Sequence, residues 1–185
     1  MSYYKDKSNV EAYIKMAEGY DGSEFVPVLR QYLSDEATML ELGMGPGKDV
    51  DIFSQYFQVT GSDYSQVFLD RYQESCPDAD LIKLDARELN IERTFDGIYS
   101  NKALYHLTRE ELRQSLKKQL MLLNPGGILF HTMWAGDGAE EREGLHFEYY
   151  TEETFAEILD EGAIVEMHRY AEMEPEDSIY FVVKK

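Results

Sequence analysis

Short apolar runs alternate with segments of helical apolar spacing along most of this chain. The runs that predict strands cover residues 38–42, 58–61, 81–84, 95–100 and 128–134. Ahead of the last run, Thr108 and Glu111 form a capping-box signature for a helix whose leucines recur at every third or fourth position. Strands that alternate with helices predict an α/β fold with a mostly parallel sheet covered on both faces.

The C-terminal part of the pattern predicts a different pairing. A helix is expected from Thr151 to Gly162, and two further strands at 163–169 and 178–183 have only a charged turn between them. Parallel pairing needs a crossover connection, so these two strands are expected to pair antiparallel at one edge of the sheet. His146 is expected in the loop that precedes the helix at Thr151.

Residues 1–37 precede the first strand and carry helical patterns around 10–17 and 25–33. The length of 185 residues suits a single domain over 1–185. Within it we expect 1–37 to form a helical lid and 38–185 a Rossmann-like core. The alternative for the first segment is ordinary packing onto the sheet.

Net charge and cysteine content limit the classes of partner and the cellular compartment that we expect. The chain has 36 acidic and 18 basic residues, a net charge of −18 that repels phosphate backbones and anionic lipids. We therefore expect no nucleic-acid and no membrane partner. Cys76 is the only cysteine, which favours a reducing cytoplasm. The acid concentrated in 137–177 suits a solvated flank, with attraction of a cationic substrate or cofactor as the alternative. Oligomeric state stays open.

A glycine-rich turn follows the first predicted strand. Its three glycines, in Leu40-Glu-Leu-Gly-Met-Gly-Pro-Gly47, permit positive φ and let the backbone approach a ligand closely. Their spacing is G-x-G-x-G, which differs from the G-x-G-x-x-G of dinucleotide binders. Glu41 lies two residues before the first glycine, where its carboxylate suits a positively charged ligand group.

Asp63 ends the second predicted strand, twenty residues after Gly43. A carboxylate at that place can accept hydrogen bonds from two vicinal ribose hydroxyls. The alternative is a helix cap, since Ser65 begins the next helix. With the glycine turn so close, we favour the ribose role.

The order and spacing of these segments resemble the small-molecule branch of the class I S-adenosylmethionine-dependent methyltransferases, across nearly the whole chain. The matching segments are Leu40–Gly47, Asp63, Leu84–Ala86, Phe95–Asn101, Leu123–Gly127 and Tyr149–Phe155. The resemblance implies a three-layer αβα sandwich with a seven-stranded sheet in the order 3-2-1-4-5-7-6. It also implies that strand 7 is antiparallel.

The same resemblance implies S-adenosylmethionine as the cofactor and S-adenosylhomocysteine as the product. Asp85 would contact the adenine amine, with Tyr64 beside the ring, while the glycine turn would hold the methionine end. The residues expected to bind the cofactor are Glu41, Gly43, Gly45, Gly47, Asp63, Tyr64, Asp85, Ala86 and Asn101.

His106 is the candidate general base, because it follows the fourth predicted strand and its unperturbed pKa of ~6.5 suits proton uptake near neutrality. Packing at a helix end is the alternative, and an acceptor that arrives deprotonated needs no base. Aromatic and histidine side chains are expected around the acceptor, where they suit a cationic or aromatic molecule. They are Tyr3, Tyr4, Tyr13, Tyr20, Tyr105, Trp134 and His146. No metal site is predicted.

Methyl transfer to a small molecule is the function we expect, because the short connections leave little room for a recognition domain. Three alternatives remain: transfer to a protein side chain, a non-catalytic regulatory protein that binds S-adenosylmethionine, and a nicotinamide-dependent oxidoreductase. The glycine spacing argues against the last.

Overall fold

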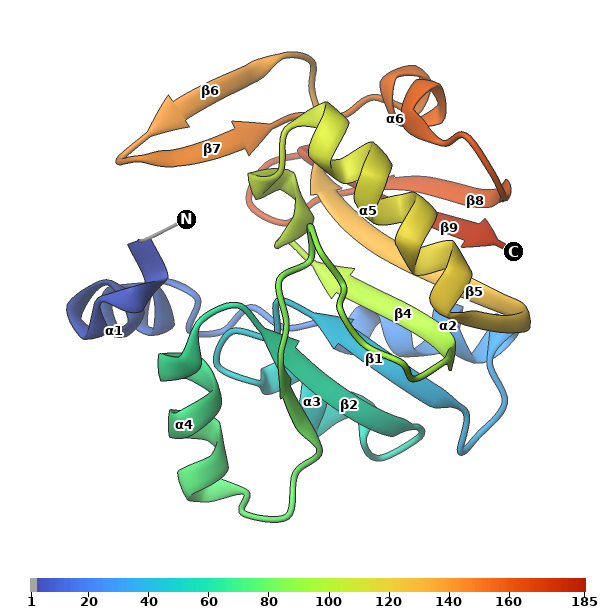
Figure 1. Cartoon of the computed structure of the whole chain (residues 1–185). Coiled ribbons are helices and arrows are strands. Elements are labelled where there is room, and N and C mark those ends of the chain that lie inside the picture. Colours follow the sequence, from blue (N-terminus) through green and yellow to red (C-terminus); the bar gives the residue numbers. More distant parts are fainter. Residues whose placement is uncertain (1–2) are drawn as a thin grey trace.

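A computed structural model describes residues 3–185, and its centre is a seven-stranded sheet (Figure 1). The strand order is β3-β2-β1-β4-β5-β9-β8, which confirms the predicted order. The strands are β1 (Thr38–Leu42), β2 (Gln58–Asp63), β3 (Leu81–Lys83), β4 (Phe95–Asn101), β5 (Leu123–Trp134), β8 (Ala163–Tyr170) and β9 (Ser178–Lys184).

Strands β1 to β5 are parallel, and β9 pairs antiparallel with both β5 and β8. The expected antiparallel edge is therefore confirmed. Since the order reverses between β1 and β4, the carboxyl ends of these two strands form the crevice where ligands bind in open α/β sheets.

Helices cover both faces of the sheet. On one face lie α5 (Arg109–Leu122) and α6 (Glu152–Ile158); on the other lie α2 (Val26–Tyr32), α3 (Lys48–Phe53) and α4 (Gln66–Ser75). Helix α1 (Lys7–Met16) precedes these helices along the chain. The structure also has three short 3-10 helices within residues 3–185: η1 (Tyr3–Lys5), η2 (Ser23–Phe25) and η3 (Leu104–His106). The capping box of Thr108 and Glu111 is present at the start of α5.

Strand β5, in the interior of the sheet, contributes side chains to the hydrophobic cores on both faces. Leu129 and Met133 belong to the cluster under α5 and α6, whereas Ile128 and Phe130 belong to the cluster under α2 and α3. Successive side chains of a strand point to opposite faces, and all four are buried because helices cover both faces of the sheet.

Strand β5 begins at Leu123, five residues before the predicted start at 128, and the structure differs from the predicted elements in two further places. An antiparallel hairpin of β6 (Ala139–Arg142) and β7 (Leu145–Glu148) forms a separate two-stranded sheet beside the carboxyl ends of the main strands (Figure 1). His146 therefore lies on β7 and not in a loop, which corrects the prediction. Helix α6 ends at Ile158, four residues before Gly162, so that helix was predicted too long.

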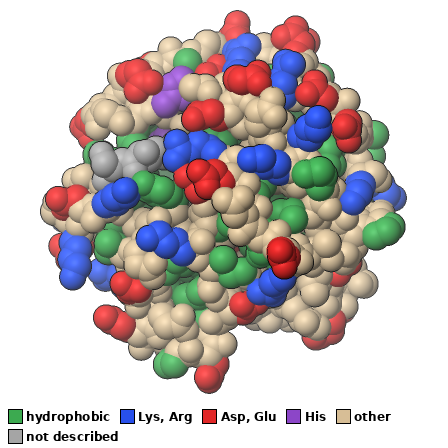
Figure 2. Space-filling model, in the orientation of Figure 1, with side chains coloured by type: hydrophobic (Ala, Val, Ile, Leu, Met, Phe, Trp, Pro, Cys, Tyr) green, Lys and Arg blue, Asp and Glu red, His purple; other side chains and the backbone are tan. Residues whose placement is uncertain are grey.

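The surface carries charges of both signs. Figure 2 shows basic and acidic side chains interspersed over the face drawn there, so the acidic excess does not form one continuous field on that face. Within residues 3–185 no helix is long and apolar enough to cross a membrane. Among the same residues, no cluster of three or more histidine, cysteine, aspartate or glutamate side chains is arranged to hold a metal ion.

Candidate active site

The glycine turn forms a tight loop between β1 and α3. Gly43, Gly45 and Gly47 have φ values of 74°, 49° and 84°, a region that L side chains rarely adopt. A Cβ on Gly43 would lie 2.4 Å from the Cβ of Ala103, and one on Gly47 would lie 2.3 Å from the ring of Tyr72. Glycine is therefore required at both positions by the space as well as by the backbone. Gly43 and Gly45 line cavities, whereas Gly47 packs against Tyr72 and lines neither of the two described below.

Glu41, near the end of β1, is a buried acid whose Oε2 atom has no hydrogen-bond partner among residues 3–185. Burial raises its pKa well above the usual value, and the nearby charges of Asp49 and Asp63 raise it further. A buried carboxylate without a partner is costly, so this atom is suited to a cationic ligand group that enters beside it.

Asp49, on α3, is a site residue that the sequence analysis missed. Its carboxylate accepts hydrogen bonds from the backbone N–H of Gly22 (2.7 Å), the hydroxyl of Tyr99 (2.8 Å) and the amide of Asn101 (3.1 Å). Burial raises its pKa in spite of these donors. Asp49 lines the same cavity as Glu41 and Asn101, and it connects the N-terminal segment to β4.

Asp63 holds the glycine turn against the end of β2. Its Oδ2 atom accepts from the backbone N–H of Gly45 (2.9 Å), and its Oδ1 atom accepts from the backbone N–H of Ser65 (2.7 Å). Burial raises its pKa to about 6 against the effect of these hydrogen bonds. The bond to Ser65 closes a turn just before α4, because it reaches the N–H of the N-cap residue and not an N–H of the first helical turn. It does not exclude ligand binding, because each oxygen has a second lone pair and the residue lines a cavity.

A smaller cavity, of about 100 Å³, lies beyond the ends of β1, β2 and β4. Predicted cofactor residues line it together: Gly43, Gly45, Asp63, Tyr64, Asp85 and Ala86. Asp85 is held by Arg87, whose Nε and Nη2 atoms donate to it at 2.9 and 2.6 Å and lower its pKa. Tyr4 and Tyr13 of the N-terminal segment also line this cavity.

A larger cavity, of about 580 Å³, adjoins the first and shares Tyr13, Gly43 and Lys102 with it. Of the predicted acceptor residues, Tyr13, Tyr20, Tyr105 and Trp134 line this space. Tyr3 and His146 line neither cavity. Tyr3 donates to Glu143 in the turn of the β6–β7 hairpin at 3.4 Å, so it joins the N-terminal segment to the hairpin.

His106, in η3, is buried and lines the smaller cavity. Its Nδ1 atom lies 2.8 Å from the carbonyl oxygen of His146. A carbonyl oxygen only accepts, so Nδ1 carries the hydrogen and Nε2 of the neutral ring is left as an acceptor. Burial lowers the pKa of His106, which keeps the ring neutral near pH 7. This is the tautomer and charge state that a general base through Nε2 requires.

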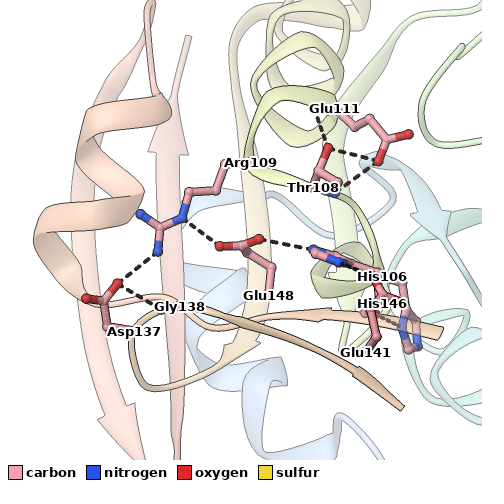
Figure 3. A network of polar contacts seen from close by, with 9 residues as sticks. All are labelled: His106, Thr108, Arg109, Glu111, Asp137, Gly138, Glu141, His146 and Glu148. Atoms are coloured by element: carbon pink, nitrogen blue, oxygen red, sulfur yellow. Dashed lines mark hydrogen bonds and ion pairs between the residues drawn. The ribbon is translucent and has the colours of Figure 1, made fainter. Parts of the chain in front are cut away.

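The hairpin that positions His106 is held by a charged network (Figure 3). Glu148 of β7 accepts from Arg109 Nε (2.6 Å) on one side and pairs with His146 Nε2 (3.0 Å) on the other. His146 Nδ1 pairs with Glu141 (2.8 Å), so both ring nitrogens face carboxylates. Burial opposes protonation of His146, but the two carboxylates outweigh it and raise its pKa. Arg109 also donates to Asp137.

Lys102, directly after β4, is a second residue that the sequence analysis missed. Its backbone has a φ of 48°, and its ammonium contacts Ser178 Oγ (2.7 Å), Glu172 (3.0 Å) and the carbonyl of Met133 (3.2 Å). The same atom lies 3.5 Å from the centre of the Trp134 ring. Burial lowers its pKa to about 8. All three hydrogens of the ammonium have partners, so Lys102 links β5, β9 and the segment between β8 and β9 at the cavity wall.

Comparisons with known proteins agree with this geometry. Residues 39–127, from β1 into β5, match the family model of a methyltransferase domain. No curated protein matches the sequence. An S-adenosylmethionine-dependent methyltransferase from Clostridium acetobutylicum has a similar structure, with 18% identity, 97% and 99% of the two chains covered and a TM-score of 0.76.

Two further solved structures are similar. One is the 1,6-didemethyltoxoflavin-N1-methyltransferase of Burkholderia thailandensis with bound 1,6-didemethyltoxoflavin and S-adenosylhomocysteine (21% identity, 96% of this chain and 85% of that chain, TM-score 0.77). The other is DesVI of Streptomyces venezuelae (19% identity, 96% and 98%, TM-score 0.72). At these identities the structures show a common fold. Residues 39–127 therefore match a methyltransferase domain, and the chain shares the fold of S-adenosylmethionine-dependent methyltransferases.

Proposed function

We propose that this protein transfers a methyl group from S-adenosylmethionine to a small-molecule acceptor, as one domain over 1–185 with residues 1–37 as its lid. One observation carries the proposal. Two adjoining cavities meet at Gly43, and their walls together hold buried acids suited to each end of the cofactor. The unpartnered Oε2 atom of Glu41 fits the positively charged end of such a ligand.

The two cavities divide the cofactor between them in this proposal. Glu41 and Asp49, in the larger cavity, would hold the ammonium of the methionine end. Asp63, in the smaller cavity, would accept from the ribose hydroxyls, and Asp85 with Tyr64 would hold the adenine. Gly43, which lines both cavities, would then face the middle of the bound cofactor.

The bound cofactor supplies a methyl group made electrophilic by the sulfonium. The chain contributes position: walls around the junction hold the acceptor in line with the methyl carbon and exclude water, which accounts for much of the acceleration in such reactions. His106 is the candidate base because its Nε2 atom is left unprotonated. It lines the smaller cavity, beside Tyr105 of the larger one, with ring centres 4.2 Å apart.

A small acceptor is favoured over a protein side chain by the shape of the site. The larger cavity has room for a molecule of modest size, and the N-terminal segment lies over it through Tyr13, Met16, Ala17 and Tyr20. The similar enzyme from Burkholderia thailandensis has the small molecule 1,6-didemethyltoxoflavin bound.

Calorimetric titration with S-adenosylmethionine, S-adenosylhomocysteine and NAD tests the proposal. We expect micromolar binding of the two sulfur compounds and none of NAD. Absence of binding by either sulfur compound would refute the cofactor assignment. Binding without methylated product from any amine, thiol, phenol or carboxylate offered would instead favour a non-catalytic regulatory protein.

A further inference from the structure

The outer wall of the larger cavity carries negative charge that the cofactor would not neutralise. Five acids line the cavity: Asp21, Glu24, Glu41, Asp49 and Glu172. Glu41 and Asp49 lie at the proposed methionine end, and Glu172 is paired with Lys102 at 3.0 Å. Asp21 and Glu24 remain, on the segment between α1 and α2.

The lysines that line the cavity do not balance these two acids. Lys48 donates to the carbonyl of Ala17 at 2.9 Å, and all three hydrogens of Lys102 have partners. Both acids are exposed residues; Asp21 accepts from the backbone N–H of Ser23, whereas Glu24 has neither a hydrogen bond nor an ion pair among residues 3–185. Partial desolvation and the charges of Glu172 and Asp21 raise the pKa of Glu24, and the charge of Lys102 opposes them only in part. The wall around Glu24 thus favours a positive charge.

Aromatic rings line the same wall. Tyr20, Tyr105, Trp134 and Tyr170 border the cavity. The ammonium of Lys102 lies 3.5 Å from the centre of the Trp134 ring and 5.5 Å from that of Tyr170, so it occupies these two rings and leaves Tyr20 and Tyr105 for a ligand. Ring faces attract cations through their quadrupole, and they provide apolar surface for the rest of an organic molecule.

We propose that the acceptor is an organic amine that enters as its ammonium form, with Glu24 as the carboxylate that selects it. This inference rests on the proposed function, since it names the acceptor for the same site. A carboxylate or a phenolate acceptor would add negative charge beside Glu24 and Asp21, where like charges repel. A neutral alcohol would leave the carboxylate of Glu24 without a charged partner.

The transfer step balances without a further reactant. The bound ammonium first loses one proton, which Nε2 of His106 accepts as the candidate base and passes on to solvent, and this leaves a lone pair on nitrogen. That pair forms the bond to the methyl carbon while the carbon–sulfur bond breaks, and sulfur keeps the bonding electrons as a thioether. The positive charge passes from sulfur to the methylated nitrogen, and the product leaves as a secondary ammonium.

Three probes of one shape test the charge preference: 2-phenylethylamine, 2-phenylethanol and 3-phenylpropionate. Their affinities are measured by calorimetry on the wild-type protein, with and without saturating S-adenosylhomocysteine. We expect the amine to bind at least about ten-fold more tightly than the alcohol and the carboxylate. An amine that binds no better than the alcohol, or does not bind, would overturn the inference. Failure of S-adenosylhomocysteine to bind would instead contradict the proposed function, and the probe series without it still decides the amine preference.

Two variants locate the preference at Glu24. Glu24→Gln keeps the shape and removes the charge, so the amine should lose most of its ten-fold advantage while the affinity for S-adenosylhomocysteine stays unchanged. Glu18→Gln is the matched control: it removes the same charge from a nearby exposed residue that does not line the cavity. An equal loss in Glu18→Gln, or an intact preference in Glu24→Gln, would contradict the role of Glu24.

Discussion

At the scale of the residue, Asp63 serves both the loop and the proposed ribose site. Asp63→Ala would remove the acceptor for the N–H groups of Gly45 and Ser65 as well as for the ribose hydroxyls. We expect S-adenosylmethionine to bind about ten-fold or more weakly, in keeping with the ~1.5–3 kcal/mol of a hydrogen bond to a charged group. Calorimetry measures this. The exposed Asp70 on α4 gives a control, since Asp70→Ala should leave the affinity unchanged; equal affinity in both variants would remove Asp63 from the site.

His106 permits a separate test, on rate. In His106→Ala the Nε2 acceptor is lost, so kcat should fall by about a hundred-fold, the lower range for a general base. The affinity for S-adenosylmethionine should stay within about two-fold, which separates a role in proton transfer from loss of the cofactor site. Rates are measured on an acceptor that the wild-type protein methylates, with His168→Ala on the exposed part of β8 as control. An unaltered kcat would leave His106 as a packed helix-end residue.

Sequence alone indicated Glu41 and Asp63 by their distance from the first glycine of the turn, and Asp85 by the family resemblance. It did not indicate Asp49 or Lys102. Asp49 is one of 36 acidic residues, and its partners come from residues 22, 99 and 101. Lys102 meets groups from residues 133, 172 and 178. Such roles arise from contacts between distant segments, which no local pattern encodes.

At the scale of the element, the sheet order was predictable and the β6–β7 hairpin was not. The main strands are apolar runs, whereas β6 is Ala-Glu-Glu-Arg and mostly exposed, so it lacks the apolar signal of a strand. Its turn has positive φ at both Glu143 (53°) and Gly144 (77°), the geometry of a tight two-residue hairpin. Glutamate is not a typical residue for that conformation, which removed the turn signal as well.

Glu148 is expected to hold this hairpin to α5. Glu148→Gln keeps the shape but loses the charge that faces Arg109 and His146, so the free energy of unfolding should fall by about 1–2 kcal/mol. Part exposure of Arg109 keeps this below the cost of breaking a fully buried pair. Urea unfolding measures the loss, and amide exchange should quicken in β6 and β7. The exposed pair of Arg30 and Asp35 provides the comparison: Asp35→Asn should cost no more than ~0.5 kcal/mol, and a similar cost in both would dismiss the network.

At the scale of the whole molecule, stability against pH depends on buried groups with opposite signs. His131 is buried on β5, with Nε2 2.7 Å from Gln119 Oε1, and desolvation lowers its pKa to about 3. In the unfolded chain its pKa is ~6.5, so below that pH only the unfolded state takes the proton and stability is lost. For Asp63 the folded pKa of about 6 exceeds the unfolded ~3.9. Here the folded state takes the proton first, and stability is gained as the pH falls from about 6 to 4.

These opposite signs predict opposite changes in slope for two variants. Between pH 7 and 5, linkage at His131 removes on the order of 2 kcal/mol of stability, and linkage at Asp63 returns on the order of 1 kcal/mol. Relative to wild type, His131→Gln should therefore lose less stability on acidification, and Asp63→Asn should lose more. The measurement is urea unfolding of the cofactor-free protein at pH 7, 6 and 5, in which each variant is compared with its own value at pH 7. Comparison of each protein with its own value at pH 7 cancels any constant cost of the substitution. Comparison between the three proteins cancels the relief of self-repulsion on acidification, because their net charges, −18 in the wild type, agree to within one charge. Parallel curves for the three proteins would show that neither residue changes its protonation on unfolding in this range.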